Sequence, residues 1–477
     1  MLPGPAPLLG LRLCPTRHTR SGGESTPPGH KGRGCCRPAT VRPGRNVGSP
    51  ARIGYVVRRA MPFKFVHAAD LHLDTPFRGV ATQGPLLGRF QDSTFRALTR
   101  ITEVCLRERV AFLLLAGDLF DVKDRSVRAR LALRRELGRL DAAGISTFIV
   151  HGNHDPLSGD TGALGLPPSV KVFGPDWEEV EVKREGRRLC RVQGISYPDV
   201  EVRDDLSARF RRTGDGFSVG LLHANLGRAE GHANYAPCTT AGLGSRGLDY
   251  WALGHVHTRA EHMLPGGGVA VYPGNPQGRH ANETGPRGCM LVEVEDGGMR
   301  RRFIPVDGVR WHKLEVPLSG VSTLDGLLAT VMEGVEARCA PELDGHAVRL
   351  TLTGRGPLHR ELARPGALAQ LEVDLREQLA RSHPPVLLES LRDSSRPEVD
   401  LEAVCAAGGF ARTLLDEVGF LAEDPAALAR LWEEEAMGAL SQRLKRLGVD
   451  ALEAPRAEWV VQAGLHGVES LHEEETS

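Results

Sequence analysis

The chain has 477 residues, which is enough for two to four domains, and its 60 basic and 60 acidic side chains balance. Its nine cysteines show no spacing typical of a metal site, which favours a reduced, cytoplasmic protein over a disulfide-linked secreted one. No apolar run approaches the about 18 residues that a membrane-spanning helix needs, so we expect no membrane partner.

The neutral total hides two pieces of opposite charge. Residues 1–60 carry 11 Lys or Arg and one acidic residue, which leaves 49 basic and 59 acidic residues in the remainder. This Arg-, Pro- and Gly-rich extension lacks hydrophobic periodicity and is predicted to be disordered. Met61 directly precedes the first predicted strand, so one hypothesis is that residues 1–60 are an over-extended gene start; an Arg-rich transit peptide is the alternative.

Five short apolar runs in the body of the chain are typical of strands buried on both faces of an α/β fold. They cover residues 63–69, 111–116, 147–151, 217–222 and 250–253. Polar residues follow them in the order Asp70 and His72, Asp118, Asn153 and His154, His223, and His255 and His257. Since sites in layered α/β folds form beyond the carboxyl ends of the strands, we expect these side chains to converge.

The residue types in this set indicate a metal centre. Carboxylate, amide and imidazole ligands without thiolates suit Mn²⁺, Fe or Zn²⁺. Each motif alone is weak, because Asp-x-His and Gly-Asp are common in turns and caps. Their joint occurrence, in order and each after a predicted strand, favours the metal site.

The motifs Asp-x-His, Gly-Asp-x-x-Asp, Gly-Asn-His-Asp, His and Gly-His-x-His resemble those of the calcineurin-like metallophosphoesterases over residues 63–305. The opening FVHAADLHLDTPF and the loop YPGNPQGRH at 272–280 resemble the DNA-exonuclease branch of that superfamily, with its SbcD-type and YhaO-type proteins. The resemblance implies a four-layer α/β metallophosphoesterase β-sandwich flanked by helices, and a metal-dependent phosphoesterase activity.

The resemblance also implies that seven side chains hold two divalent ions, which we expect to be Mn²⁺. One ion would be held by Asp70, His72 and His257, the other by Asn153, His223 and His255, with Asp118 as the bridge. Two such ions about 3.5–4 Å apart can clamp the attacking and leaving oxygens of an in-line displacement and activate a shared water.

Four further residues are predicted to act beside the metal centre. His154 would stabilise the scissile phosphate or protonate the leaving oxygen, and Asp121 would orient it. The alternative for Asp121 is the N-cap of a helix predicted at 125–140, and relatives tend to carry histidine at its position. Arg279 and His280 would contact phosphate; a solvated surface turn is equally compatible with their sequence. His67 and His151 are predicted as core or supporting residues.

The pattern changes after the phosphoesterase region, predicted at 61–308. Strands at 310–318, 347–353 and 385–391 alternate with helices at 324–337 and 358–380, the second interrupted at Pro365. This predicts a small α/β cap domain over 309–400. A helical segment is predicted over 401–477, in which leucine and alanine recur at helical spacing at 426–447; packing on the cap and docking to a partner helix are both open.

The function predicted from these features is that of a DNA exonuclease or nuclease subunit in repair. The alternatives are a phosphoesterase acting on a small nucleotide or phosphomonoester, and a non-catalytic scaffold on the same fold. The acidic body suggests weak intrinsic DNA binding, although basic clusters occur at 183–188 and 209–212. The resemblance implies DNA and an SMC-like ATPase as partners, and we also expect a second copy in a homodimer. The chain has no Gly-x-x-x-x-Gly-Lys-Ser/Thr loop, so any ATP-driven step would need such an ATPase.

Overall fold

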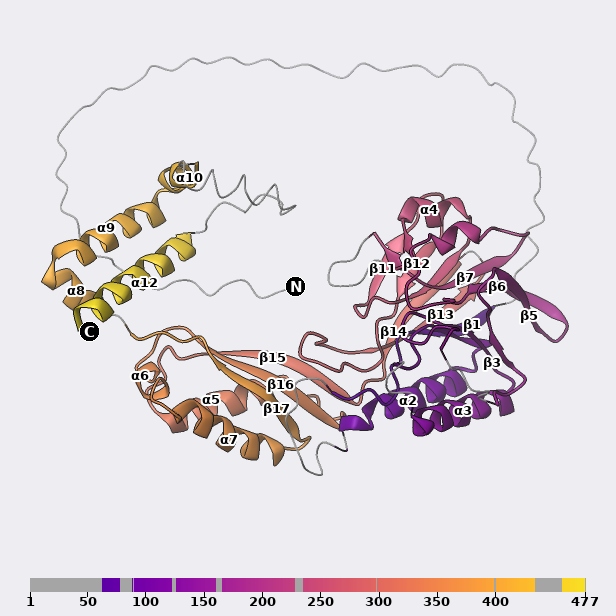
Figure 1. Cartoon of the computed structure of the whole chain (residues 1–477), viewed down its shortest axis with the longest axis horizontal. Coiled ribbons are helices and arrows are strands. Elements are labelled where there is room, and N and C mark those ends of the chain that lie inside the picture. The colour runs from indigo at the N-terminus through magenta and orange to yellow at the C-terminus, as the bar shows by residue number, and fades with distance from the viewer. Residues whose placement is uncertain are drawn as a thin grey trace, which may run out of the picture. The chain divides into compact units, whose positions relative to one another are not determined.

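The computed structural model describes residues 62–77, 88, 90–121, 126–159, 165–227, 235–296, 298–398, 400–433 and 457–476. The predicted disorder of residues 1–60 and most of the predicted helix at 426–447 lie outside them. The structure divides into a unit over Val57–Arg396 and a second unit that contains Pro397–Ser477 (Figure 1).

The first unit is built around two six-stranded sheets. The first sheet has the order β14 (Gly298–Pro305), β13 (Gly288–Glu295), β1 (Phe63–Ala68), β2 (Phe112–Ala116), β3 (Ser146–Val150) and β4 (Val170–Val172). The second has the order β11 (Ala260–Met263), β12 (Val269–Tyr272), β10 (Tyr250–Gly254), β7 (Phe217–His223), β6 (Arg187–Ile195) and β5 (Glu178–Arg184). Strands β1 to β4 run parallel, as do β6, β7, β10 and β12, so their carboxyl ends share an edge in each sheet.

The central strands are apolar throughout because both of their faces are covered. Along β1, Val66 packs among side chains of α2 (Ser93–Glu108) and α3 (Val127–Ala142), while Phe65 packs against the second sheet. A third cluster, which includes Trp251 and Leu243, covers the outer face of the second sheet under the short helices η2 (Leu206–Arg209) and α4 (Thr240–Ser245). A two-stranded sheet of β8 (Asn225–Leu226) and β9 (Pro237–Cys238) lies beside it. This layering confirms the predicted α/β sandwich flanked by helices.

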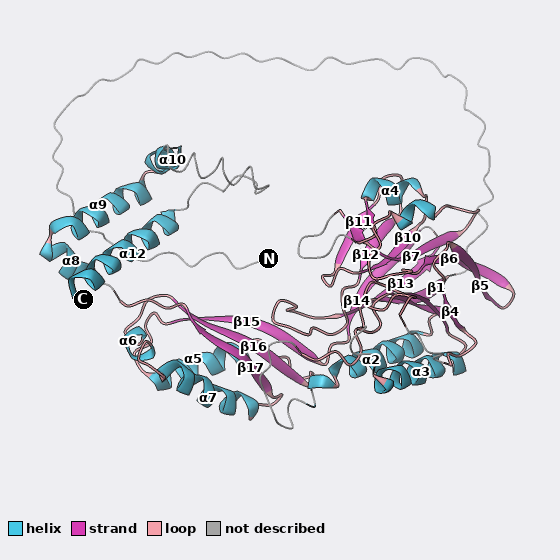
Figure 2. Cartoon of the chain, viewed as in Figure 1, coloured by secondary structure: helices cyan, strands magenta, loops and turns pink. Residues whose placement is uncertain are grey.

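A smaller three-stranded parallel sheet follows in the same unit (Figure 2). Its elements are β15 (Val309–Pro317), α5 (Leu324–Glu336), β16 (Gly345–Thr353), α6 (His359–Leu362), α7 (Ala367–Ala380) and β17 (Val386–Asp393). Helices α5 and α7 cover one face of the sheet with a leucine- and valine-rich cluster. Pro365 lies between α6 and α7, where the sequence predicts the interruption.

The small sheet packs on the sandwich through aromatic and charged contacts. Trp311 of β15 is fully buried, stacks on Phe77 and donates its indole N–H to the carbonyl of Gly278 at 3.0 Å. Arg96 and Asp344 form an ion pair at 2.9 Å between α2 and the loop before β16. The loop that contains Gly278 therefore connects the small sheet to the end of β12, near the predicted site.

The second unit is helical in its described part. It contains α8 (Leu401–Ala407), α9 (Gly409–Glu423), α10 (Pro425–Glu433) and α12 (Ala457–Thr476). Leu415 of α9 and Val468 of α12 belong to one buried cluster, so the two helices pack together. None of the helices in the described part of the chain combines the length and the apolar character that a bilayer crossing requires.

Candidate metal centre

The loops that follow β1 and β2 are tied together by backbone hydrogen bonds. Asp70 N–H donates to the carbonyl of Gly117 and His72 N–H donates to that of Asp118, each at 3.0 Å. Because β1 and β2 are parallel neighbours, their ends lie side by side. The predicted ligands of the first two motifs therefore meet across a shared edge.

Four of the seven predicted ligands have left-handed backbone conformations. The φ angles are 53° at Asp70, 41° at His72, 53° at Asp118 and 99° at His255. L-residues adopt this region rarely, at a cost of about 1–2 kcal/mol each. Such strain persists only where the surrounding structure enforces it, and it clusters at functional sites.

The glycine of the Gly-Asn-His-Asp motif leaves space for the side chain of a predicted ligand. A Cβ atom added to Gly152 would lie 2.3 Å from Oδ1 of Asp118 and 2.8 Å from the imidazole of His223. Only hydrogen fits at that distance. The glycine therefore allows the third loop to close over Asp118.

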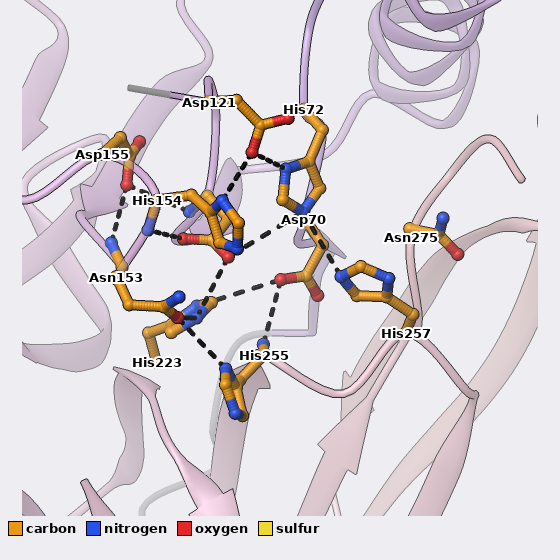
Figure 3. Close-up of polar contacts among 12 residues, drawn as sticks. Asp70, His72, Asp121, Asn153, His154, Asp155, His223, His255, His257 and Asn275 are labelled. Atoms are coloured by element: carbon orange, nitrogen blue, oxygen red, sulfur yellow. Dashed lines mark hydrogen bonds and ion pairs between the residues drawn. The ribbon is translucent and has the colours of Figure 1, made fainter. Parts of the chain in front are cut away.

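One group of predicted ligands comprises Asp70, His72 and His257, whose donor atoms lie within 4.8 Å of one another (Figure 3). Nε2 of His72 lies 3.3 Å from Nε2 of His257. One oxygen of Asp70 accepts from the N–H of His255 at 3.0 Å, and the other oxygen is buried without a hydrogen-bond partner among the described residues. A buried, unpaired carboxylate oxygen is unfavourable unless a cation or a donor meets it.

The second predicted group is centred on the amide oxygen of Asn153. This oxygen lies 3.1 Å from Nε2 of His223 and 3.2 Å from Nδ1 of His255. Oδ2 of Asp118 lies 3.4 Å from Nε2 of His223 and 3.8 Å from Nε2 of His72. The structure thus brings all seven predicted ligands together and places Asp118 between the two groups.

The protonation of these side chains fits a pair of divalent ions. Burial, and next the Arg279 guanidinium, lower the pKa of His72 to about 4, so this imidazole is neutral at pH 7. Burial also opposes charge on His223, but the Asp118 carboxylate outweighs it and raises the pKa of His223 to about 9. A ligating imidazole must be neutral, so an ion bound there would replace that proton. Oxygen and imidazole donors without thiolates suit a divalent metal.

His154 and Asp121 form the predicted pair. Nδ1 of His154 lies 2.6 Å from Oδ1 of Asp121, and this contact raises the pKa of His154. The imidazole side chain is 44% exposed, whereas the predicted ligand histidines His72 and His223 are buried. The alternative for Asp121 is wrong, because the side chain of Ser126 caps α3 by accepting from Ala129 N–H.

Arg279 and His280 differ in how closely they approach the centre. Nη1 of Arg279 lies 3.3 Å from Oδ2 of Asp121, and its side chain is 11% exposed, so it belongs to the site rather than to a solvated turn. His280 is more exposed and lies 3.3 Å from a carboxylate oxygen of Glu283. The phosphate contact of both residues stays a prediction.

The two histidines predicted as core or supporting residues lie outside the ligand groups. His67 is fully buried in β1 and contacts the hydroxyl of Tyr250 at 3.0 Å. His151 lies 3.4 Å from the carboxylate of Asp155.

Sequence reasoning missed two carboxylates that hold the site in shape. Asp155 accepts hydrogen bonds from the N–H groups of Gly152 at 2.8 Å, Leu119 at 2.9 Å and Asp118 at 3.2 Å, and so ties the second ligand loop to the third. Glu283 contacts His257 at 2.6 Å. Asp155 could have been found from its place in the Gly-Asn-His-Asp motif, whereas no motif contains Glu283.

Comparison with known proteins shows two family matches. Residues 63–259 match the model described as calcineurin-like phosphoesterase. Residues 311–396 match the model described as metallophosphoesterase YhaO, middle domain. The first match covers β1 to β10 and all seven predicted ligands, and the second covers most of the small parallel sheet.

Individual relatives agree with these models. The chain is 37% identical over 344 residues to the protein of Bacillus subtilis described as an uncharacterized metallophosphoesterase YhaO, covering 71% of this chain and 83% of that protein. It is 28% identical over 219 residues to the DNA double-strand break repair protein Mre11 of Sulfurisphaera tokodaii, covering 45% of this chain and 54% of that protein. The DNA double-strand break repair protein Mre11 of Methanopyrus kandleri is 21% identical over 404 residues, covering 72% of this chain and 86% of that protein.

Among solved structures, a dimetal phosphatase of Danio rerio matches with 14% identity and a TM-score of 0.35, covering 51% of this chain and 96% of that one. The family matches at residues 63–259 and 311–396, together with the Bacillus subtilis relative, decide the assignment. The chain therefore belongs to the calcineurin-like metallophosphoesterases, as a YhaO-type member of this family of metal-dependent phosphoester hydrolases.

Proposed function

We propose that this chain is a two-metal phosphodiesterase that cleaves DNA as a nuclease subunit in repair. One observation carries the proposal: seven predicted ligands from five separate strand ends meet in one buried cluster, with Asp118 between the two groups. A non-catalytic scaffold would have no need to keep this donor set or the strained loops that present it.

The residues around the cluster have complementary roles in this reaction. Two divalent ions bound there would supply positive charge to the phosphate and an activated water near neutral pH. Nδ1 of His154 donates its N–H to Oδ1 of Asp121 at 2.6 Å. Nε2, the other ring nitrogen, is therefore the atom proposed to protonate the leaving oxygen. Arg279, buried beside Asp121, would orient the phosphate as a fixed cation.

DNA is the proposed substrate and Mn²⁺ the proposed metal. The Mre11 relatives carry DNA double-strand break repair in their names. The acidic balance of residues 61–477 argues that this chain grips DNA weakly alone. We therefore propose an SMC-like ATPase partner, which would supply DNA affinity and ATP hydrolysis, and a homodimer as the working form.

The test is a Mn²⁺-dependent assay on end-labelled single- and double-stranded DNA. We expect Asp118→Asn and His154→Ala to lose most cleavage, the first with loss of bound metal by elemental analysis and the second with metal retained. Asp176→Asn is the matched control, because that carboxylate is 93% exposed and distant in sequence from every predicted ligand. Unchanged cleavage in both site variants would overturn the mechanism. Cleavage of bis(4-nitrophenyl) phosphate without any cleavage of DNA would instead assign a small phosphodiester substrate.

A further inference from the structure

The loop between β12 and β13 contains a carboxylate that is buried beside the metal centre. Glu283 is 4% exposed, and both of its oxygens accept hydrogen bonds. Oε1 lies 2.6 Å from Nδ1 of His257 and 3.3 Å from Nε2 of His280. Oε2 accepts from the backbone N–H of Arg279 at 2.7 Å and from the side-chain amide of Asn275 at 3.0 Å. A buried carboxylate with this many donors is held rigidly in one position.

The first of these contacts determines which nitrogen of His257 is available to a metal. Because a carboxylate only accepts hydrogen bonds, the ring proton of His257 must be on Nδ1. Nε2 then carries the lone pair, and it is this atom that lies 3.3 Å from Nε2 of His72. A carboxylate that orients a ligating histidine in this way also raises the basicity of the ligand.

The second oxygen holds the residue that approaches the acid pair. The backbone of Arg279 is fixed by Glu283, and its guanidinium reaches Oδ2 of Asp121 at 3.3 Å. Asn275, the remaining donor, is itself held by Arg287 at 2.8 Å, and Arg287 also donates to the carbonyl of His257. One side chain thus connects a predicted ligand to the predicted phosphate-binding arginine.

We propose that Glu283 is a positioning residue that aims Nε2 of His257 at one of the two ions and fixes the backbone of Arg279. The proposal rests on the proposed function, since it takes His257 as a ligand. It assigns Glu283 no contact with the substrate. Loss of this side chain weakens one metal site and leaves the other intact, because the contacts among Asn153, His223 and His255 do not involve the loop.

The experiment titrates Mn²⁺ into the metal-stripped full chain by calorimetry, for the wild type, Glu283→Gln and Glu283→Ala. Gln has the size of Glu, but its amide group places a donor against the donors of the loop. We expect the Mn²⁺ affinity of one of the two binding events to weaken by about 10–100-fold in both variants, and that of the other to change by less than about 2-fold. In the DNA cleavage assay, excess Mn²⁺ should restore part of the rate of both variants. Glu389→Gln is the matched control, because Glu389 is also a buried, charge-paired glutamate, bonded to Arg349 at 2.8 and 2.5 Å in the small sheet.

The outcomes separate a positioning role from a merely structural one. Two unchanged binding events in Glu283→Gln, with only a lower melting temperature, would overturn the proposal, as would equal weakening of both events. The titration does not use DNA, so a chain that binds two ions but cleaves no DNA would refute the nuclease proposal and still decide the role of Glu283. A wild-type chain that binds no ion would overturn both.

Discussion

Oδ1 of Asp121 lies 3.0 Å from Nδ1 of His72, a predicted metal ligand, as well as 2.6 Å from Nδ1 of His154, the predicted acid. One oxygen atom therefore orients two imidazoles with different roles. The rings of His72 and His154 are 5.0 Å apart and nearly perpendicular. Thr75 donates to the other oxygen of Asp121 at 2.5 Å and helps to fix it.

Replacing Asp121 should therefore do more damage than replacing His154. We expect His154→Ala to lose about 10²–10⁴-fold in kcat with metal affinity unchanged. Asp121→Ala should lose at least as much in kcat and also weaken one metal site by about 10–100-fold, because His72 loses its orienting partner. Steady-state kinetics and Mn²⁺ titration of both variants check this. Thr75→Val, which removes one hydrogen bond to Asp121, serves as the mild control; equal metal affinity in all three variants would contradict the shared role.

Asp155 should matter for stability more than for chemistry. Its buried carboxylate accepts from three backbone N–H groups, and hydrogen bonds to charged groups contribute about 1.5–3 kcal/mol each. We expect Asp155→Ala to lower the free energy of unfolding by at least about 3 kcal/mol, as measured by urea denaturation. Asp155→Asn keeps one acceptor oxygen, so its free energy of unfolding should lie between those of the wild type and Asp155→Ala. A loss below about 1 kcal/mol in the alanine variant would show that the loops close without this clamp.

Gly152 offers a test of the space over Asp118. Gly152→Ala puts a methyl group 2.3 Å from Oδ1 of Asp118, so the carboxylate or the loop must move. We expect the variant to fold but to lose most of its bound metal and activity. Gly138→Ala in α3 is the control, since nothing lies within 4 Å of its added Cβ and alanine favours a helix by up to about 1 kcal/mol. Full metal content in Gly152→Ala would show that the site tolerates the displacement.

The small sheet should be sensitive to acid through a histidine pair. Nε2 of His312 lies 3.0 Å from Nδ1 of His346. Burial, and next the neighbouring His346, lower the pKa of His312 from its ordinary value of 6.5 to about 4. Between these values the unfolded chain binds a proton that the folded chain does not, so stability falls as the pH falls from about 6.5 to 4.

Thermal unfolding at pH 7.5 and pH 5 would measure this effect. We expect His312→Gln to lose less stability on acidification than the wild type. Glutamine binds no proton in this pH range, so residue 312 no longer adds to the proton uptake of the unfolded chain relative to the folded chain. His383→Gln, at an exposed position outside the pair, should behave as the wild type does. An identical pH response in His312→Gln would place the acid sensitivity elsewhere.

The strands, and the positions of the predicted ligands at their ends, could be predicted from the sequence for a physical reason. Runs buried on both faces are continuously apolar, so the predicted strand at 111–116 is found at Phe112–Ala116, with Asp118 at its carboxyl end. Because neighbouring strands of the sheet are parallel, their carboxyl ends lie at the same edge, and the residues that follow them come together. The helix predicted at 125–140 occurs at Val127–Ala142, and Ser126 caps its first turn.

The supporting residues could not be predicted, because their contacts depend on how loops fold back. Glu283 and His257 are 26 positions apart in a stretch with no periodicity, and Asp121 and His72 are 49 apart. A pairing of this kind leaves no regular spacing in the sequence. The same holds for Trp311, whose aromatic character predicts burial but not its hydrogen bond to Gly278.

The left-handed backbone at Asp70, His72, Asp118 and His255 sets a limit on engineering this enzyme for thermal robustness. Glycine would relax the backbone at any of these positions, yet each such exchange would delete a predicted ligand. Heat tolerance therefore has to be sought in the helices, the small sheet and the surface, where substitutions leave the ligand loops alone. A selection for stability without a selection for catalysis should erode these four positions first.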